Sequence, residues 1–177
     1  MGDILLITGR PGVGKTTLVR RVAEGPGARL GGFYTEEIRR RGVRTGFRLV
    51  TLDGHAAVFA NVDFATHSPH RVGRYGVDLS ALEGIGVAAL HRAARRGQVV
   101  LVDEIGKMEL LSPGFRAALE GISAGPAPLL ATITAAAHPW ADAFKRRPGV
   151  VLLTLTPTNR DRMLESVEAW VSARGEG

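Results

Sequence analysis

The chain of 177 residues contains no cysteine. This absence excludes disulfide bonds, thiol catalysis and metal sites built on thiolates. Aromatic residues make up only 6% of the sequence, so few side chains are available to stack on nucleic-acid bases. No apolar run approaches the roughly 18 to 20 residues of a membrane-spanning helix, and the apolar start at Ile4 is too short for a signal peptide. We therefore expect a cytoplasmic protein that crosses no membrane.

Acidic residues are in the minority, because 17 Asp and Glu stand against 23 Lys and Arg, for a net charge of +6. A basic balance favours anionic partners such as nucleotides, nucleic acid or acidic surfaces. The arginines are scattered, however, with short clusters at residues 39–41, 95–96 and 146–147 and no long basic tail. Nucleic acid is therefore disfavoured as the main partner. A monomer is the default oligomeric state.

Residues 9–16 read Gly-Arg-Pro-Gly-Val-Gly-Lys-Thr, a complete phosphate-binding loop. The loop follows an apolar run at residues 4–7 and precedes a helical pattern from residue 15 to about residue 24, which is the context that the motif requires. Its glycines let backbone N–H groups turn inward around an anion, and the helix N-terminus adds partial positive charge. The motif predicts that Lys15 reaches the β- and γ-phosphates of a nucleotide and that Thr16 ligates Mg²⁺.

Four apolar runs predict strands that are buried on both faces, as in parallel sheets. They are residues 4–7, 99–102, 129–133 and 150–155. Helical patterns lie between and after them, and an alternation of strands and helices predicts a three-layer α/β fold with a mostly parallel central sheet. We expect one domain over residues 1–172 and a frayed tail over residues 173–177.

Helix-capping signals predict where several helices begin and end. Gly25-Pro26 ends the first helix. Ser80 and Glu83 form a capping box for a second helix that ends at Gly97, and Ser112-Pro113 opens a third. Two further helices are expected, at residues 139–147 and from Thr156-Pro157 to about residue 171.

Residues 32–60 break the alternation of strands and helices. Extended stretches at 32–38, 43–52 and 56–60, with a turn at Asp53-Gly54, predict an antiparallel extension at one edge of the sheet. Residues 61–78 are rich in Gly, Pro and His and are expected to form a long loop.

A second chemical element follows the apolar run at 99–102, where Asp103 and Glu104 stand together. In phosphate-loop proteins such a strand lies beside the first one and delivers an Asp to the Mg²⁺ shell, which makes Asp103 the expected metal ligand. Glu104 is then positioned to polarise a water molecule for attack on the γ-phosphate. Hydrolysis needs an activated water, whereas a kinase excludes water, so Glu104 favours hydrolysis over transfer.

At these residues the chain resembles the THEP-type, or cancer-related, nucleoside-triphosphatases among the P-loop NTPases. The resemblance is carried by ITGRPGVGKTT at 7–17, by GFYTEEIRRRGVRTGFRLVTLDG at 32–54 with VGRYGVDL at 72–79, by VDEIGKMELL at 102–111 and by Thr-Asn-Arg at 158–160. It implies an enzyme that hydrolyses ATP, GTP, CTP, UTP and TTP, with Mg²⁺, to the nucleoside diphosphate and phosphate.

The resemblance also implies which residues contact the nucleotide, and Lys15 and Glu104 are the expected catalytic residues among them. The implied nucleotide contacts are Gly9, Arg10, Pro11, Gly12, Val13, Gly14, Lys15, Thr16 and Thr17, together with Val100, Leu101, Val102, Asp103, Glu104, Ile105, Gly106 and Lys107.

Other residues remain open from the sequence. Thr132 or Thr134, at the end of the 129–133 strand, is a candidate sensor of the γ-phosphate, with Thr132 the better match to the family. Glu36 and Glu37 have no assigned role, and the pair His67 and His70 is read as part of a polar loop rather than as a metal site. Five arginines are candidates for an arginine finger and none is assigned: Arg71, Arg74, Arg146, Arg147 and Arg160.

Two other function classes stay open. A nucleotide or nucleoside kinase would need an acceptor pocket and a lid, for which residues 61–78 are the candidate. A nucleotide-driven switch would hydrolyse slowly and act with nucleic acid or with a protein partner.

Overall fold

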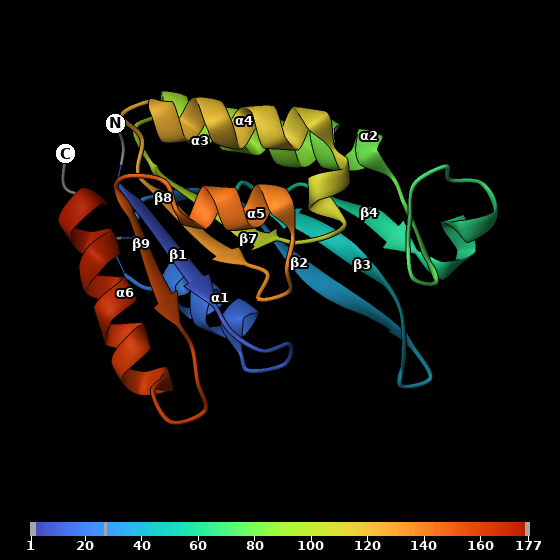
Figure 1. Ribbon diagram of the computed structural model, residues 1–177, viewed down its shortest axis with the longest axis horizontal. Helices are drawn as coiled ribbons and strands as arrows, with labels where there is room; N and C mark the ends of the chain where they lie inside the picture. The colour runs from blue at the N-terminus through green and yellow to red at the C-terminus, as the bar shows by residue number, and fades with distance from the viewer. Residues whose placement is uncertain (1–2, 27, 176–177) are drawn as a thin grey trace.

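The structure is a computed structural model that describes residues 3–26 and 28–175 (Figure 1). In this part of the chain nine strands form one sheet in the order β5-β6-β4-β3-β2-β7-β8-β1-β9. The strands are β1 (Ile4–Thr8), β2 (Leu30–Arg40), β3 (Val43–Thr51), β4 (Ala56–Asn61), β5 (Arg71–Val72), β6 (Tyr75–Val77), β7 (Val99–Ile105), β8 (Leu129–Ile133) and β9 (Val150–Thr154).

The helices flank this sheet in two layers. They are α1 (Lys15–Glu24), the short α2 (Leu79–Ala81), α3 (Ala88–Arg95), α4 (Pro113–Ala124), α5 (Pro139–Lys145) and α6 (Arg160–Gly175). Two 3-10 segments, η1 (Val62–Thr66) and η3 (Glu109–Leu111), and the π-helical η2 (Leu82–Val87) connect them. No helix in the described ranges is both long and apolar enough to cross a membrane.

The sheet has a parallel half and an antiparallel half, as predicted. β1 pairs in parallel with β8 and β9, β7 pairs in parallel with β8, and the first residues of β2 pair in parallel with β7. β3, β4, β6 and β5 then add antiparallel strands at one edge. The extension is longer than residues 32–60, because the segment predicted as a loop at 61–78 contributes η1 and the β5–β6 hairpin.

Strand alternation divides the core into two layers, which Figure 1 shows as helices above and below the sheet. Leu5 and Ile7 of β1 point to α1 and α6, whereas Ile4 and Leu6 point to α3, α4 and α5. Because successive side chains of a strand point to opposite faces, a wholly apolar strand must be covered on both sides. The predicted three-layer α/β fold is therefore confirmed.

Two expectations about the strands are wrong. β8 lies between β1 and β7, so the strand that carries Asp103 is not beside the first strand. β9 is not buried on both faces, since Val151 is 50% exposed and Leu152 is 42% exposed. β9 is the edge strand of the sheet, with β1 as its one neighbour. Its apolar sequence therefore predicted more burial than an edge strand has.

Two helix starts differ from the prediction as well. Asp78, not Ser80, caps the second helix, because its side chain accepts a hydrogen bond from the Ala81 N–H. Glu83 instead accepts a hydrogen bond from the Ser112 hydroxyl at 2.5 Å. The last helix begins at Arg160, because the Asn159 side chain accepts from the Thr156 N–H and holds residues 156–159 in a turn.

The predicted tail at residues 173–177 is helical as far as Gly175, where α6 ends. Residues 176 and 177, like residues 1 and 2 of the expected domain, lie outside the described residues. By contrast, the ends of α1 at Gly25 and the start of α4 at Ser112-Pro113 agree with the capping signals.

The upper core centres on Phe115 of α4, which is fully buried, with its ring 6.2 Å from that of Phe33. Phe115→Ala should lower the free energy of unfolding by about 3 to 5 kcal/mol, since it removes buried area and leaves a cavity. Urea denaturation checks this value. Val43→Ala, at a site 55% exposed, is the control and should change stability by less than about 0.5 kcal/mol. Equal effects of the two substitutions would contradict the packing described.

Candidate active site

The phosphate-binding loop connects β1 to α1 at the carboxyl end of the parallel strands. Gly14 begins the helix with φ 108°, a left-handed conformation that a side chain would strain. Its carbonyl accepts the first helical hydrogen bond, from the Leu18 N–H at 3.0 Å. The free N–H groups at the start of α1 therefore face the loop, and this is an anion-binding arrangement.

Lys15 lies inside the loop rather than in solvent. Its Nζ donates hydrogen bonds to the carbonyls of Gly9 at 2.8 Å and Arg10 at 3.3 Å, and the residue is 9% exposed. The loop's own carbonyls thus hold a buried ammonium group at the place where the helix N-terminus also favours negative charge.

Asp103 joins three elements of the fold. Its Oδ1 accepts hydrogen bonds from the hydroxyl of Thr16 on α1 at 3.2 Å and from that of Thr132 on β8 at 2.6 Å. Asp103 is 1% exposed, and its other oxygen, Oδ2, has no hydrogen-bond partner among the described residues. The predicted metal ligands Thr16 and Asp103 therefore lie together, with one buried carboxylate oxygen left for a further ligand.

The pKa of the Asp103 carboxyl is raised above its ordinary value by burial. The hydrogen bonds of Thr132 and Thr16, a backbone hydrogen bond from Thr35 and the positive charge of Lys15 act against this rise. A bound cation favours the ionised carboxylate and reverses the effect of burial. An orphaned, buried carboxylate oxygen beside a threonine hydroxyl is suited to Mg²⁺, which prefers oxygen ligands.

Glu104 follows in β7 and points to a different environment. It is half-buried, and burial raises the pKa of its carboxyl, opposed by the nearby charge of Lys15 and assisted by that of Asp103. Lys15, Asp103 and Glu104 thus interact electrostatically at one site, although they come from two separate segments of the chain.

Comparisons with known proteins agree with this arrangement. The family model described as NTPase matches residues 4–168. The chain belongs to the NTPase family. It is 47% identical over 163 residues to the nucleoside-triphosphatase THEP1 of Thermotoga petrophila, covering 92% of this chain and 89% of that protein. The resemblance seen in the sequence is therefore confirmed.

Two solved structures of the NTPase family share the fold. The crystal structure of THEP1 from Aquifex aeolicus is 41% identical, with a TM-score of 0.85 over 95% of this chain and 98% of that one. The solution structure of a human cancer-related nucleoside triphosphatase is 34% identical, with a TM-score of 0.82 over 97% and 98% of the two chains. These relatives and the motifs confirm the prediction that the chain is an enzyme of the nucleoside-triphosphatase family.

Glu109 is a residue of the site region that sequence reasoning missed. It is 6% exposed, and burial raises the pKa of its carboxyl to about 8, with the negative charge of Glu104 adding to the rise. A signal was available, because Glu109 is the one carboxylate in the otherwise apolar run from Met108 to Leu111. A charged residue in an apolar run is normally exposed to solvent, and it is seldom fully buried unless it has a partner.

Other predicted nucleotide contacts fall into two groups. The side chains of Val100, Leu101, Val102 and Ile105 are fully buried in the core of this NTPase-family fold, so they support β7 rather than face a ligand. Arg10, Pro11, Thr17 and Lys107 are exposed around the site. Thr132 is fully buried and reaches Asp103, whereas Thr134 lies past the end of β8, where its hydroxyl accepts from the Ala136 N–H.

Glu36 and Glu37 have a structural explanation. Glu36 pairs with Arg20 of α1 and with Arg48 of β3, and Glu37 pairs with Arg39 and Arg44. These ion pairs tie the antiparallel extension together and link it to α1.

The arginines considered as fingers lie in different places. Arg147 pairs with Glu120, Arg74 donates to the carbonyl of Arg44, and Arg71 and Arg146 are exposed. Arg160 reaches the phosphate loop, where its Nε donates to the Val13 carbonyl at 3.0 Å. This contact lies at the phosphate loop itself, whereas Asp103 lies on β7, and none of the five arginines is assigned as a finger.

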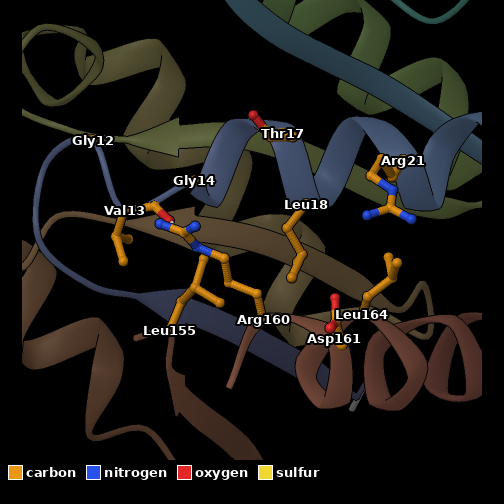
Figure 2. A pocket seen from close by; sticks show the side chains of 10 residues that line it. All are labelled: Gly12, Val13, Gly14, Thr17, Leu18, Arg21, Leu155, Arg160, Asp161 and Leu164. Atoms are coloured by element: carbon orange, nitrogen blue, oxygen red, sulfur yellow. The ribbon is translucent and has the colours of Figure 1, made fainter. Parts of the chain in front are cut away.

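A pocket of about 260 Å³ lies beside the loop, between α1 and α6. Figure 2 shows Leu18 pointing from α1 toward α6 and Arg160 reaching from the start of α6 toward Gly14. Leu18, Leu155 and Leu164 supply apolar walls, and Thr17, Arg21 and Asp161 supply polar groups. The pocket is thus lined by the loop, α1 and α6, and Asp103 is not among its lining residues.

His67 and His70 line a second, shallow pocket at the far edge of the sheet. No group of three or more His, Asp or Glu side chains in residues 3–26 and 28–175 is arranged to hold a metal. A Mg²⁺ ion bound with a nucleotide needs one or two protein ligands only, because phosphate and water oxygens complete its shell.

The buried carboxyl of Glu109 predicts a pH dependence of stability. Its pKa is about 8 in the folded chain against an ordinary value of 4.5, so between these values the folded state holds a proton that the unfolded state has lost. The unfolding free energy should therefore fall as pH rises from about 5 to 8, by at most about 1.4 kcal/mol per pH unit from this group. Glu109→Gln should remove that contribution.

Urea denaturation of both proteins at several pH values measures the difference. The exposed Glu165 of α6 provides the control, and Glu165→Gln should follow the wild type at every pH. Parallel curves for the wild type and Glu109→Gln would contradict the raised pKa.

Proposed function

We propose that this chain is a Mg²⁺-dependent nucleoside-triphosphatase that hydrolyses nucleoside triphosphates, including ATP, GTP, CTP, UTP and TTP, to the diphosphate and phosphate. One observation carries the proposal: Thr16 and Thr132 converge on the buried Asp103. The names of the relatives support the same activity.

In the proposed reaction the loop and Lys15 bind the phosphates. The N–H groups at the start of α1 and the Lys15 ammonium offset the charge of the β- and γ-phosphates. Lys15 exchanges its contacts with the Gly9 and Arg10 carbonyls for phosphate oxygens, so the loop keeps it close to its working position.

Mg²⁺ fits the residues at the end of β7. Thr16 and the free Oδ2 of Asp103 would hold the ion together with phosphate oxygens, and Thr132 fixes the carboxylate from the other side. When bound, Mg²⁺ neutralises the charge that develops on the phosphate oxygens.

Glu104 is proposed to orient and deprotonate the attacking water. The water oxygen forms a bond to the γ-phosphorus as the bond from phosphorus to the β–γ bridging oxygen breaks, and the water proton passes to the Glu104 carboxylate. Burial raises the pKa of Glu104 and so makes its carboxylate a better proton acceptor, while the charge of Lys15 opposes this rise.

The pocket between α1 and α6 is proposed to take the nucleoside. Its lining includes residues 12–14 of the loop and Thr17, directly after Thr16, so it adjoins the residues that are proposed to bind the phosphates. Its apolar walls are Leu18, Leu155 and Leu164, and its polar lining residues are Thr17, Arg21, Arg160 and Asp161. Apolar walls discriminate weakly between bases, which agrees with the proposed range of substrates.

The kinase alternative receives no support from the fold. Residues 61–78 form η1 and the β5–β6 hairpin at the far edge of the sheet, and β4, β3, β2, β7 and β8 lie between β6 and β1. A segment at that edge is poorly placed to close over the loop at the end of β1. We also propose a cytoplasmic location and a monomeric state, and both proposals rest on the sequence alone.

Glu104→Gln should keep nucleotide binding and reduce turnover by at least about 100-fold, because the amide cannot accept the water proton. Lys15→Ala should weaken both binding and turnover. Phosphate release with Mg²⁺ and each nucleoside triphosphate, without acceptor or partner, measures turnover, and calorimetry measures binding. Undiminished turnover by Glu104→Gln would exclude it as the base, and binding without release by the wild type would overturn the hydrolase proposal.

Arg160→Ala should raise the KM for nucleoside triphosphates several-fold with little change in kcat, since it opens the wall of the pocket. Inhibition by inorganic tripolyphosphate, which has no nucleoside, should stay the same. Arg162→Ala is the matched control, because Arg162 is an exposed arginine of the same helix. If Arg160→Ala weakened tripolyphosphate and nucleotide equally, the pocket would not be the nucleoside site.

A further inference from the structure

Glu109 has a buried carboxyl group that has no role in the proposed reaction. It opens η3, the short segment that follows β7, and it is 6% exposed. None of the ion pairs between described residues includes it. Its carboxyl accepts hydrogen bonds from the backbone N–H groups of Gly106 and of Glu109 itself, but these do not offset the effect of burial, which raises its pKa. Burying a charged carboxylate without a cation is costly, and such a group normally takes up a proton instead.

Glu104 and Glu109 lie against the same face of Gly106. A Cβ added to Gly106 would meet Oε1 of Glu104 at 2.7 Å and Oε2 of Glu109 at 3.0 Å. The turn between them is closed by a hydrogen bond from the Leu110 N–H to the Gly106 carbonyl at 2.9 Å. The chain therefore folds back at Gly106 and brings the two carboxyl groups together, and any side chain at this position would displace both.

Two carboxyl groups that lie against the same glycine repel each other when both are ionised, so ionising both is costly in a site sheltered from water. The more deeply buried of the two, Glu109, is the one that keeps a proton. A neutral carboxyl has one O–H to donate, and the carboxylate that shares the face of Gly106 is that of Glu104.

We propose that Glu109 is a positioning residue, which donates a hydrogen bond from its neutral carboxyl to the Glu104 carboxylate and so holds it toward the phosphate-binding loop. This inference rests on the proposed function, in which Glu104 orients the attacking water. It explains why a carboxyl occupies an otherwise apolar run, and why Gly106 separates the two glutamates.

The charged groups around Glu109 determine how the pair responds to pH. Asp103 and Glu104 of β7 both act on Glu109 with negative charge, and Lys15 of α1 acts on Glu104. At the start of α4, the Ser112 N–H donates to the Glu109 carbonyl at 3.1 Å, and the Ser112 hydroxyl donates to Glu83. Loss of the Glu109 proton at alkaline pH therefore removes the donor and adds a repelling charge beside Glu104.

The test compares Glu109→Gln, which keeps the shape and a hydrogen-bond donor, with Glu109→Leu, which keeps only the bulk. Glu109→Leu should lower kcat by about 10- to 100-fold with KM unchanged, because a misplaced catalytic group costs rate rather than binding. Glu109→Gln should keep kcat within about threefold at pH 7 and lack the fall in activity above about pH 8 that is expected of the wild type. The control is Glu165→Leu, at an exposed site, which should match the wild type.

Full activity in Glu109→Leu, or an equal loss in both variants with the fold intact by circular dichroism, would overturn the proposal. If Glu109→Leu does not fold, the alkaline profile of Glu109→Gln decides, because a merely structural residue would leave that profile unchanged.

A readout that does not need activity keeps the two proposals apart. The carboxyl carbon of Glu109, followed by ¹³C NMR, should titrate in the wild type and shift by about one pH unit to lower pH in Glu104→Gln, because the neighbouring charge is gone. An unchanged titration would mean that the carboxyl groups are not coupled and would overturn the inference. If the wild type releases no phosphate while this coupling is present, the proposed hydrolysis fails but the pairing of the glutamates stands.

Discussion

The buried carboxylate of Asp103 holds the site together. It receives hydroxyl hydrogen bonds from Thr16 at the start of α1 and from Thr132 on β8, so a helix and two strands meet at one oxygen atom. Hydrogen bonds to a charged acceptor contribute more than neutral ones, and a buried acceptor left without them is expensive. The position of the phosphate-binding loop relative to β7 therefore depends on this contact.

The insertion of β8 between β1 and β7 makes this contact possible. Thr132 can reach Asp103 because their strands are neighbours, and Thr16 reaches it from the helix that follows β1. The strand that carries the loop and the strand that carries the carboxylate are thus coupled through side chains rather than through their backbones.

Positive and negative groups lie close to each other in the site. The loop side has the Lys15 ammonium and the N-terminus of α1, whereas β7 and η3 contribute three carboxyl groups at 103, 104 and 109. Burial raises the pKa of all three, and Lys15 lowers that of the first two. In the proposed reaction each carboxyl has a different role: Asp103 binds a cation, Glu104 orients a water molecule, and Glu109 is a neutral hydrogen-bond donor. Environment, not residue type, separates these roles.

The sequence by itself determined the parts with a local physical cause. The loop at 9–16, the apolar strands and the caps at Gly25 and Ser112 depend on neighbouring residues and on the alternation of side chains, and these agree with the structure. It also placed Asp103 and Glu104 at the end of a strand. The candidate sites at 36, 37, 67 and 70, in contrast, had no local pattern that could decide among their roles.

Only the tertiary structure decided which strands are neighbours, which strand is the exposed edge and which residues far apart in the chain share a site. Thr132 meets Asp103, Glu36 meets Arg20 and Arg160 meets Val13 through packing between distant segments, and no spacing along the chain encodes such contacts. The same holds for Glu109, whose unusual state comes from burial beside Glu104 rather than from its neighbours in sequence. Burial and proximity are properties of the folded chain, so the chemistry that depends on them could be read only from the fold.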